Sequence, residues 1–206
     1  MSIDYRLHAH IATITINRPE TRNSLDMAHF RDLAQAWAAF RDDAGAWVAV
    51  ITGVGRDFCT GADLKKFIPE LTGDLPKPEG WDKDDAIHAV LHRFPVYKPI
   101  IAAVNGTCVA GGFEMLGCTD IRVAVPEARF AVMEPKRGLF AGGGSTVRLP
   151  RQTGNREDAG DESPLGNYPP TAKRRSPPRR TPPAVPDAPG ARSASSSHDR
   201  AARASP

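Results

Sequence analysis

Two glutamates set beside glycines are the residues of this chain best suited to acid–base chemistry. Glu114 ends the run Ala110-Gly-Gly-Phe-Glu114, and Glu134 ends the run Phe130-Ala-Val-Met-Glu134. A nonpolar cleft would raise the pKa of either carboxyl group and let it hold or pass a proton near neutral pH. Taken alone, each is more often a solvated residue, on a helix surface or in a loop. The pair predicts a proton-transfer site if the fold brings both carboxyl groups to one cleft.

A scaffold must position these carboxylates, and several segments predict its strands. Ile11–Ile16 alternates apolar and polar residues, as a half-buried strand does. Trp47–Thr52 and Pro99–Gly106 are near-continuous apolar runs, which predict strands covered on both faces. Two shorter strands are expected at Asp120–Ala124 and Arg129–Ala131.

Helical spacing of apolar residues predicts a helix that runs to about Asp42 and begins at a cap between Ser24 and Asp26. Its core-facing stripe is Met27, Phe30, Leu33, Ala34, Trp37 and Phe40. Further helices are expected over about Asp84–Phe94 and Gly111–Gly117. The alternation of strands and helices predicts a layered α/β fold.

Two segments are predicted to border a binding cleft. Gly55–Lys65 follows the carboxyl end of a predicted strand, where ligands of α/β proteins tend to lie. Pro69–Lys83 is rich in proline, glycine and charge, which is typical of a mobile surface loop.

The composition divides the 206 residues into two unlike parts. Residues 1–152 read as a globular catalytic core, whereas residues 153–206 are dominated by Pro, Arg, Ser, Ala and Gly. Such a segment buries too little apolar surface to offset the cost of ordering, so a disordered tail is expected. A nucleic-acid-binding arm is disfavoured because aromatic residues are almost absent and acidic residues interrupt the basic charge. Much of the net charge of +3 lies in this tail, at Lys173–Arg175, Arg179–Arg180, Arg192, Arg200 and Arg203.

The sequence contains no pattern typical of a metal site, a secretion or membrane segment, or a P-loop. Cys59, Cys108 and Cys118 have no metal-ligand spacing, and their odd number favours reduced thiols in the cytoplasm. No basic-then-apolar leader or long apolar stretch predicts secretion or a membrane span. Gly142–Thr146 lacks the Lys-Ser/Thr pair of a phosphate-binding P-loop.

Six motifs form an ordered set that is more specific than any one of them. They are Thr13–Pro19 with Asn23, Phe58–Leu64, Lys98–Gly106, Ala110–Glu114, Cys118–Asp120 and Glu134. In order and spacing they resemble the enoyl-CoA hydratase, or crotonase, family over about residues 3–152. The resemblance implies a layered β-β-α spiral core, an acyl-CoA or enoyl-CoA substrate, no metal, and no cofactor apart from the CoA of the substrate.

The resemblance also implies roles for four residues. In the family, two backbone N–H groups bind the thioester oxygen and stabilise an enolate, and the matching residues are Ala62 and Gly111. Such donors need close backbone approach, which small residues allow. The matching carboxylates are Glu114, assigned mainly to water activation, and Glu134, assigned mainly to protonation of the α-carbon.

Substrate-binding positions are carried over from the same motifs. Besides Ala62 and Gly111, they are Asp63, Leu64, Lys65 and Arg22. Asp63 is also a candidate helix cap, and Lys65 and Arg22 are candidates for contacts to the CoA phosphates, although exposed basic residues are common.

The chain departs from the family after Arg148–Gln152. Family members continue there with helices that complete the core, cover the acyl pocket and mediate trimer assembly. A frameshift is our hypothesis, because Arg, Pro, Ala, Gly and Ser are what GC-rich codons give out of frame. We therefore expect the C-terminal helical region to be missing and the family homotrimer or hexamer not to form. The leading interpretation is a hydratase, with an isomerase or a non-catalytic acyl-CoA-binding remnant as alternatives.

Overall fold

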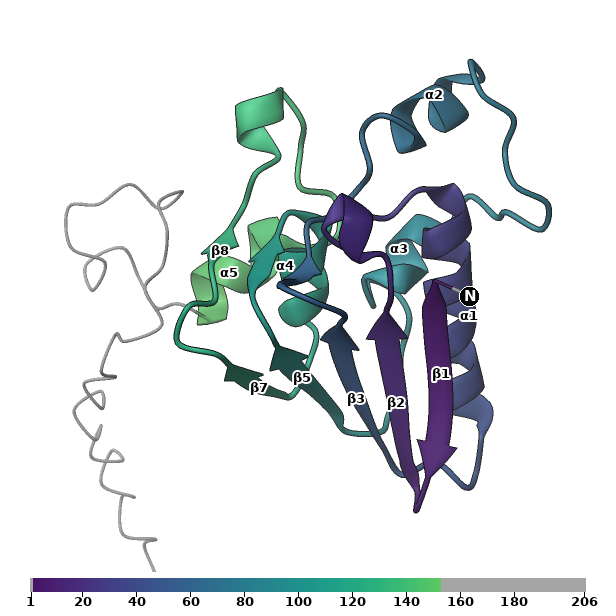
Figure 1. The fold of residues 1–206 in the computed structure, drawn as a ribbon, viewed down its shortest axis with the longest axis vertical. Helices are drawn as coiled ribbons and strands as arrows, with labels where there is room; N and C mark the ends of the chain where they lie inside the picture. The colour runs from purple at the N-terminus through teal and green to yellow at the C-terminus, as the bar shows by residue number, and fades with distance from the viewer. Residues whose placement is uncertain (1, 153–206) are drawn as a thin grey trace, which may run out of the picture. The chain divides into compact units, whose positions relative to one another are not determined.

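A five-stranded sheet and a three-stranded sheet form the framework of the chain. The computed structural model describes residues 2–152, so the predicted tail, frameshift and missing helices lie outside the described residues. The order of the larger sheet is β1-β2-β3-β5-β7 (Figure 1). Strands β1 and β2 pair antiparallel, and all other pairs are parallel. The strands are β1 Ile3–His8, β2 Ile11–Ile16, β3 Val48–Gly53, β5 Ile100–Val104 and β7 Ile121–Ala124.

The smaller sheet is built from strands that continue those of the larger one. Its order is β4-β6-β8, all parallel, and each strand follows β3, β5 or β7 along the chain. A helix follows each such pair, which confirms the β-β-α layering expected from the sequence. The remaining elements are β4 Asp57–Cys59, β6 Thr107–Val109, β8 Phe130–Ala131, α1 Met27–Asp42, α2 Phe67–Thr72, α3 Asp85–Ala89, α4 Gly111–Leu116 and α5 Ser145–Gln152.

Helix α1 begins and packs as the sequence predicts. The carboxylate of Asp26 caps it by accepting a hydrogen bond from the His29 N–H at 3.2 Å. All six residues of the predicted stripe are buried, and the indole of Trp37 donates to the Ala89 carbonyl at 3.0 Å. This last bond ties α1 to the end of α3, directly before the residues that border the candidate site.

The prediction that two strands are covered on both faces is wrong. In β3, Ala49 and Ile51 are buried while Val48 and Val50 are partly exposed, and β5 alternates in the same way. The opposite face of the neighbouring strand β2 carries partly exposed threonines. Figure 1 shows α1 and α3 behind the sheet, on one side of it. A run of apolar residues therefore overstated how completely the described helices enclose the sheet.

Two further expectations need correction, and two strands were not foreseen. The helix expected over Asp84–Phe94 ends at Ala89, because the chain turns through left-handed backbone at Leu91 and Arg93. The segment Pro69–Lys83 is not entirely loop, since α2 extends into it. Strands β4 and β6, which are only three residues long, were not expected from periodicity.

A buried asparagine connects the turn before α1 to the loop between the sheets. Asn23 is fully buried, and its side chain accepts from the Arg18 N–H and donates to the Val54 and Asp57 carbonyls, at 2.9, 2.9 and 2.6 Å. Its φ of 56° lies in the left-handed region that asparagine tolerates better than most residues. The motif around Asn23 thus fixes the backbone that leads to both sheets.

We expect Asn23→Ala to lower the free energy of unfolding by about 3 kcal/mol, because the fully buried Asn23 side chain makes three hydrogen bonds to the backbone that alanine cannot make. Urea unfolding followed by circular dichroism measures it. The matched control is Asn17→Ala, which removes one exposed bond to Asp4 and should change stability by about 0.5 kcal/mol or less. Equal losses in the two variants would contradict the role of Asn23.

Candidate active site

Two loop-to-helix segments place the predicted N–H donors side by side. Gly61 has a φ of 83°, and a β-carbon built on it would lie 2.9 Å from the Gly111 nitrogen. The residues on either side of Ala62 pair with Leu25, through Leu25 N–H to the Gly61 carbonyl and Asp63 N–H to the Leu25 carbonyl, both at 2.8 Å. That pairing turns the Ala62 N–H away from Leu25. Within residues 2–152, neither the Ala62 nor the Gly111 N–H donates to another protein group.

The backbone is strained where the second donor begins. Ala110 has φ 50° and ψ −130°, an unusual conformation for a residue with a β-carbon, and it precedes the first residue of α4. Its own N–H is held by the Ala131 carbonyl at 3.0 Å. The strain is therefore maintained by the smaller sheet, and it leaves the Gly111 N–H at the positive end of α4.

The carboxylate of Glu114 is buried and held by a residue that sequence reasoning missed. Only 7% of Glu114 is exposed, and its Oε1 accepts from the Ser145 N–H at 3.3 Å and the Ser145 hydroxyl at 3.0 Å. Its other oxygen, Oε2, lies against Gly143, where a β-carbon would come within 2.6 Å. The glycine run before Ser145 was the available signal, because such close backbone approach requires glycine.

Glu134 lies close enough to Glu114 for the two carboxylates to affect each other. Burial raises the pKa of Glu134, and the negative charge of Glu114 raises it further, against an opposing effect of nearby backbone amides. Its Oε2 is buried and has no hydrogen-bond partner within residues 2–152. One carboxylate is thus stabilised by two donors, whereas the other is set up to hold a proton.

The side chain of Val90 packs against the two segments that carry Gly111 and Gly143. It is buried, and its methyl groups lie 3.8 Å and 3.0 Å from β-carbons built on Gly111 and Gly143. No local sequence signal identified Val90, because its role depends on the turn that ends α3. Val90 therefore lies beside both Gly111 and the Gly143 backbone that contacts Glu114. Gly61 places Ala62 next to Gly111, and the charge of Glu114 acts on Glu134.

Asp63 is engaged in a buried ion-pair network. The guanidinium of Arg18, which is 6% exposed, contacts the carboxylates of Asp63 at 3.0 Å and Asp26 at 3.5 Å. The second oxygen of Asp63 accepts from the Lys65 N–H at 3.2 Å. The helix-cap alternative for Asp63 is wrong, because the N-cap of α2 is Lys66 and no side chain caps that helix. Asp63 instead holds the Ala62 loop against the start of α1 through Arg18.

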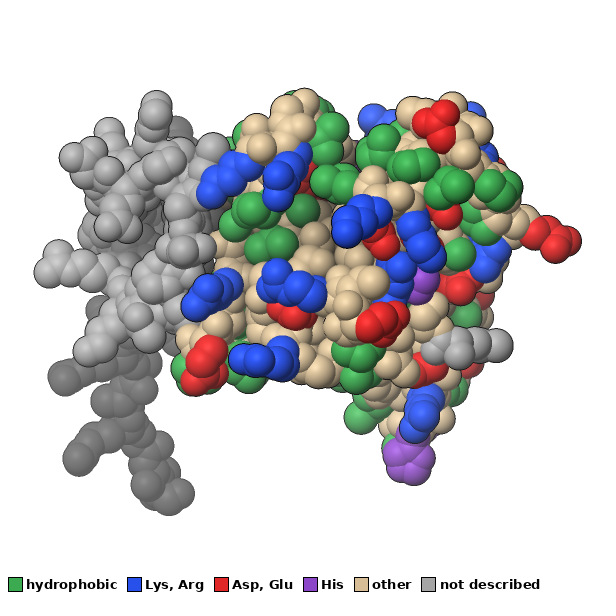
Figure 2. Space-filling view, turned by 45° about the horizontal axis from the view of Figure 1, so that its top comes forward, with side chains coloured by type: hydrophobic (Ala, Val, Ile, Leu, Met, Phe, Trp, Pro, Cys, Tyr) green, Lys and Arg blue, Asp and Glu red, His purple; other side chains and the backbone are tan. Residues whose placement is uncertain are grey.

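The other substrate-binding candidates lie on the surface. Leu64 and Lys65 are exposed. On the face drawn in Figure 2, Lys and Arg side chains are scattered among apolar and acidic ones. The Arg22 guanidinium makes a bidentate pair with Asp57 at 2.9 and 3.1 Å and donates to the Thr107 hydroxyl at 3.2 Å. Arg22 thus links the start of α1 to the smaller sheet, and phosphate contacts by Lys65 and Arg22 stay predictions.

Lowering the pH should reduce the folding stability of the chain through protonation of Asp26. Burial alone would raise the pKa of Asp26, but His29 and the Arg18 charge together hold it well below its ordinary range. A lowered folded-state pKa gives stability that is present above the unfolded value of about 4 and lost as the pH falls below it. We expect Asp26→Asn to lose less stability than the parent chain between about pH 4.5 and 2.5 in urea unfolding, and identical losses would contradict this.

The three cysteines are free thiols in the described part of the chain. Burial raises the pKa of Cys59 to about 12 and that of Cys118 to about 11, so both remain protonated near neutral pH. Among residues 2–152, no group of three or more His, Cys, Asp or Glu side chains is arranged to hold a metal ion. Over the same residues, no helix has the length and apolar character needed to cross a membrane.

Sequence comparisons place this arrangement among known proteins. The enoyl-CoA hydratase/isomerase family matches residues 6–160, past the boundary at residue 152 that the composition predicts. Mevalonyl-coenzyme A hydratase sidH of Aspergillus fumigatus is 40% identical over 73% of this chain, and enoyl-CoA hydratase EchA19 of Mycobacterium tuberculosis is 42% identical over 69%. The chain spans about half the length of these curated relatives, 54% and 53%.

The fold agrees with the sequence match. An enoyl-CoA hydratase from Mycobacterium tuberculosis H37Rv superposes with a TM-score of 0.61 at 39% identity, over 73% of this chain and 56% of that one. The same β-β-α layering therefore accompanies the same motifs. The chain belongs to the enoyl-CoA hydratase/isomerase family.

Proposed function

We propose that this chain carries the active site of a hydratase that adds water reversibly to a 2-enoyl-CoA. One observation carries the proposal. Glu114, which accepts hydrogen bonds from Ser145, and Glu134, whose pKa is raised, occur together with the backbone N–H groups of Ala62 and Gly111, which have no acceptor within residues 2–152. A hydratase needs one group to take a proton from water and another to give a proton to carbon.

In the proposed reaction, the thioester oxygen is bound by the N–H groups of Ala62 and Gly111. Glu114 accepts a proton from water as the water oxygen bonds to the β-carbon, and the electrons of the double bond move toward the thioester oxygen. The resulting enolate is stabilised by the two donors, each of which is worth roughly 3 to 4 kcal/mol in comparable sites. The two hydrogen bonds from Ser145 hold Oε1 of Glu114 in a fixed position for this step.

Protonation of the α-carbon completes the addition. Glu134 gives its proton to the enolate, and the second C–H bond of the product forms as the enolate collapses to the thioester. The raised pKa of Glu134 supports this role, because the carboxyl group holds a proton at a pH where an ordinary glutamate has lost it. Water supplies the hydroxyl group and Glu134 supplies the α-proton. Loss of a proton from Glu114 to solvent and gain of one by Glu134 then restore the two carboxyl groups.

The CoA portion is proposed to lie along the loop that contains Asp63, Leu64 and Lys65. Asp63 is proposed to hold the loop through Arg18, while Lys65 and Arg22 face solvent and can meet phosphate oxygens. CoA enters as part of the substrate, and no separate cofactor is proposed.

Loss of enoyl-thioester absorbance on mixing the 206-residue chain with crotonyl-CoA tests the proposal. Hydration removes the conjugated double bond, so absorbance should fall to an equilibrium value, and the Glu114→Gln/Glu134→Gln double variant should leave it unchanged. Binding of crotonyl-CoA without turnover would identify an acyl-CoA binder. Movement of the double bond in a 3-enoyl-CoA without hydration of crotonyl-CoA would identify an isomerase.

A further inference from the structure

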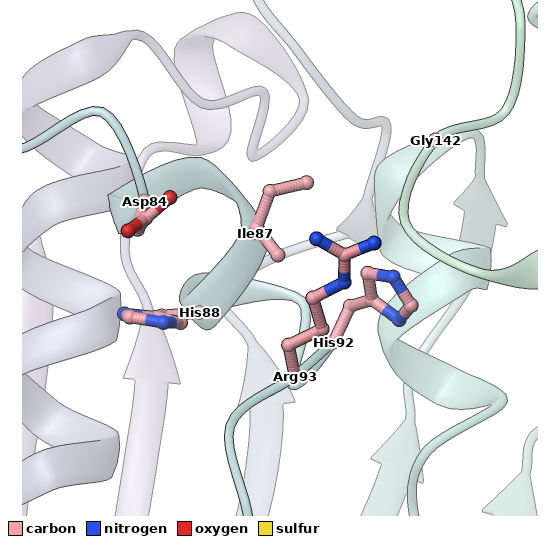
Figure 3. Close-up of a pocket in the computed structure, with 6 residues that line it drawn as sticks. All are labelled: Asp84, Ile87, His88, His92, Arg93 and Gly142. Atoms are coloured by element: carbon pink, nitrogen blue, oxygen red, sulfur yellow. The ribbon is translucent and has the colours of Figure 1, made fainter.

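A cavity of about 310 Å³ beside the candidate active site has a polar lining (Figure 3). We call it the Arg93 cavity; it is lined by Asp84, Ile87, His88, His92, Arg93 and Gly142. An acyl pocket for a plain alkyl chain would be expected to present mainly apolar side chains. The lining here contains one aliphatic side chain, that of Ile87, among charged and imidazole groups.

The Arg93 cavity adjoins the group that is proposed to activate water. Gly142 precedes Gly143, whose backbone lies against the Glu114 carboxylate, and a β-carbon on Gly144 would be 3.0 Å from His92 Nδ1. The charge of Glu114 also affects the pKa of His92. The inference takes the acyl chain beyond the β-carbon, where Glu114 is proposed to act, to run along the Gly142–Gly144 segment into this cavity.

A strained turn aims the polar residues into the cavity. Leu91 and Arg93 have φ of 57° and 56°, in the left-handed region that costs a residue with a β-carbon conformational energy. Two contacts fix the chain just before the turn, the Trp37 indole to the Ala89 carbonyl and the Cys118 thiol to the Val90 carbonyl. Strain that is held in place by surrounding structure is typical of functional sites.

Two arginines, Arg93 and Arg148, lie near His92 in this turn, and their positive charges act on its pKa. One terminal nitrogen of the Arg148 guanidinium donates to the Gly143 carbonyl at 2.7 Å, and the other lies 3.2 Å from His92 Nδ1, so both terminal nitrogens are engaged. Burial, with Arg148 and Arg93, lowers the pKa of His92 against the opposing charge of Glu114, which favours neutral imidazole. Arg93 itself has no hydrogen-bond or ion-pair partner in the described part of the chain.

The one acidic lining group lies away from Arg93. In Figure 3, Asp84 and His88 lie on one side of Ile87, and Arg93 and His92 lie on the other, toward Gly142. The end of the cavity nearest the Gly142 loop is therefore cationic. A guanidinium matches the two oxygens of a carboxylate better than it matches any other group an acyl chain commonly carries.

We propose that the Arg93 cavity binds a carboxylate on the acyl chain, so that the substrates are 2-enoyl-CoA thioesters bearing a second acid group. This inference rests on the proposed function, because it assumes that the acyl chain passes Glu114. Arg93 is the specificity-determining residue, and it forms a charge-assisted pair with the substrate carboxylate. A plain alkyl chain offers no hydrogen-bond acceptor to the exposed Arg93 guanidinium.

Binding of two saturated thioesters of equal chain length tests the inference without turnover. Titration calorimetry on the 206-residue chain should show glutaryl-CoA binding about tenfold or more tightly than pentanoyl-CoA. Arg93→Gln should remove that preference by weakening glutaryl-CoA alone, and Arg93→Lys should retain part of it. The matched control Arg6→Gln changes an exposed arginine of β1 outside the cavity and should leave both affinities unchanged.

The outcomes separate the two proposals. Equal affinity of the parent chain for the two thioesters, or a preference that survives Arg93→Gln, would overturn the inference and leave the hydratase proposal standing. Selective binding of glutaryl-CoA by a chain that fails to hydrate any 2-enoyl-CoA would uphold the inference and defeat the hydratase proposal. Failure of both thioesters to bind would defeat both.

Discussion

Glu134→Gln is expected to slow hydration of crotonyl-CoA by about 10²- to 10⁴-fold, the range typical of a lost general acid. The amide cannot deliver a proton to the α-carbon, but it keeps the size and polarity of the carboxyl group. Affinity for a saturated thioester should therefore change little. Initial rates of absorbance loss, with calorimetry for binding, measure both effects.

A second measurement on the same residue separates the roles of the two carboxylates. Exchange of the α-protons of butyryl-CoA with deuterated solvent requires the group that serves the α-carbon but no attacking water. Glu134→Gln should abolish this exchange, whereas Glu114→Gln should abolish hydration and retain part of the exchange. Equal loss of exchange in both variants would contradict the division of roles, and Glu127→Gln, at an exposed acidic residue, is the matched control.

Local sequence patterns predicted the elements that are held by local interactions. The stripe of α1 and the alternation of β2 are both confirmed, because an apolar face of regular period has few ways to bury itself. The start of α4 at Gly111 is also confirmed, although the residue that turns the chain into the helix is Ala110, at a φ of 50°, and not a glycine.

The candidate site was predictable only in its motif-bearing part. Ala62, Gly111, Glu114 and Glu134 belong to motifs, and the structure places Gly61, beside Ala62, against Gly111 and Glu134 within reach of the charge of Glu114. Their catalytic roles stay predictions. Ser145 and Val90 escaped notice because their importance comes from contacts across the chain, 31 residues away in the case of the bond from Ser145 to Glu114.

Errors arose where burial depends on what surrounds an element. The apolar runs of β3 and β5 suggested cover on both faces, yet alternate residues are partly exposed. The helix expected to reach Phe94 ends early for a similar reason: the contacts of Ala89 and Val90 with α1 and Cys118 favour a turn over another helical repeat. In both cases, tertiary contacts outweigh the local pattern.

Gly143→Ala should reduce hydration of crotonyl-CoA by about 100-fold while leaving the fold intact. The added methyl group would lie 2.6 Å from Glu114 Oε2 and 3.0 Å from a Val90 methyl group. The end of the Glu114 side chain must then move, which strains both bonds from Ser145 and misplaces the group that activates water. Since a flexible side chain can absorb the clash, the free energy of unfolding should fall far less than activity does.

The neighbouring glycine provides the matched control. A β-carbon on Gly142 meets no atom within 4 Å, so Gly142→Ala makes the same chemical change without touching Glu114, and crotonyl-CoA is too short to fill the cavity that Gly142 lines. Its hydration rate should stay close to that of the parent chain. Equal rates for the two variants would show that contact of Gly143 with Glu114 is unimportant. A Gly143→Ala chain that loses its circular dichroism signal would instead show that this glycine is needed for folding.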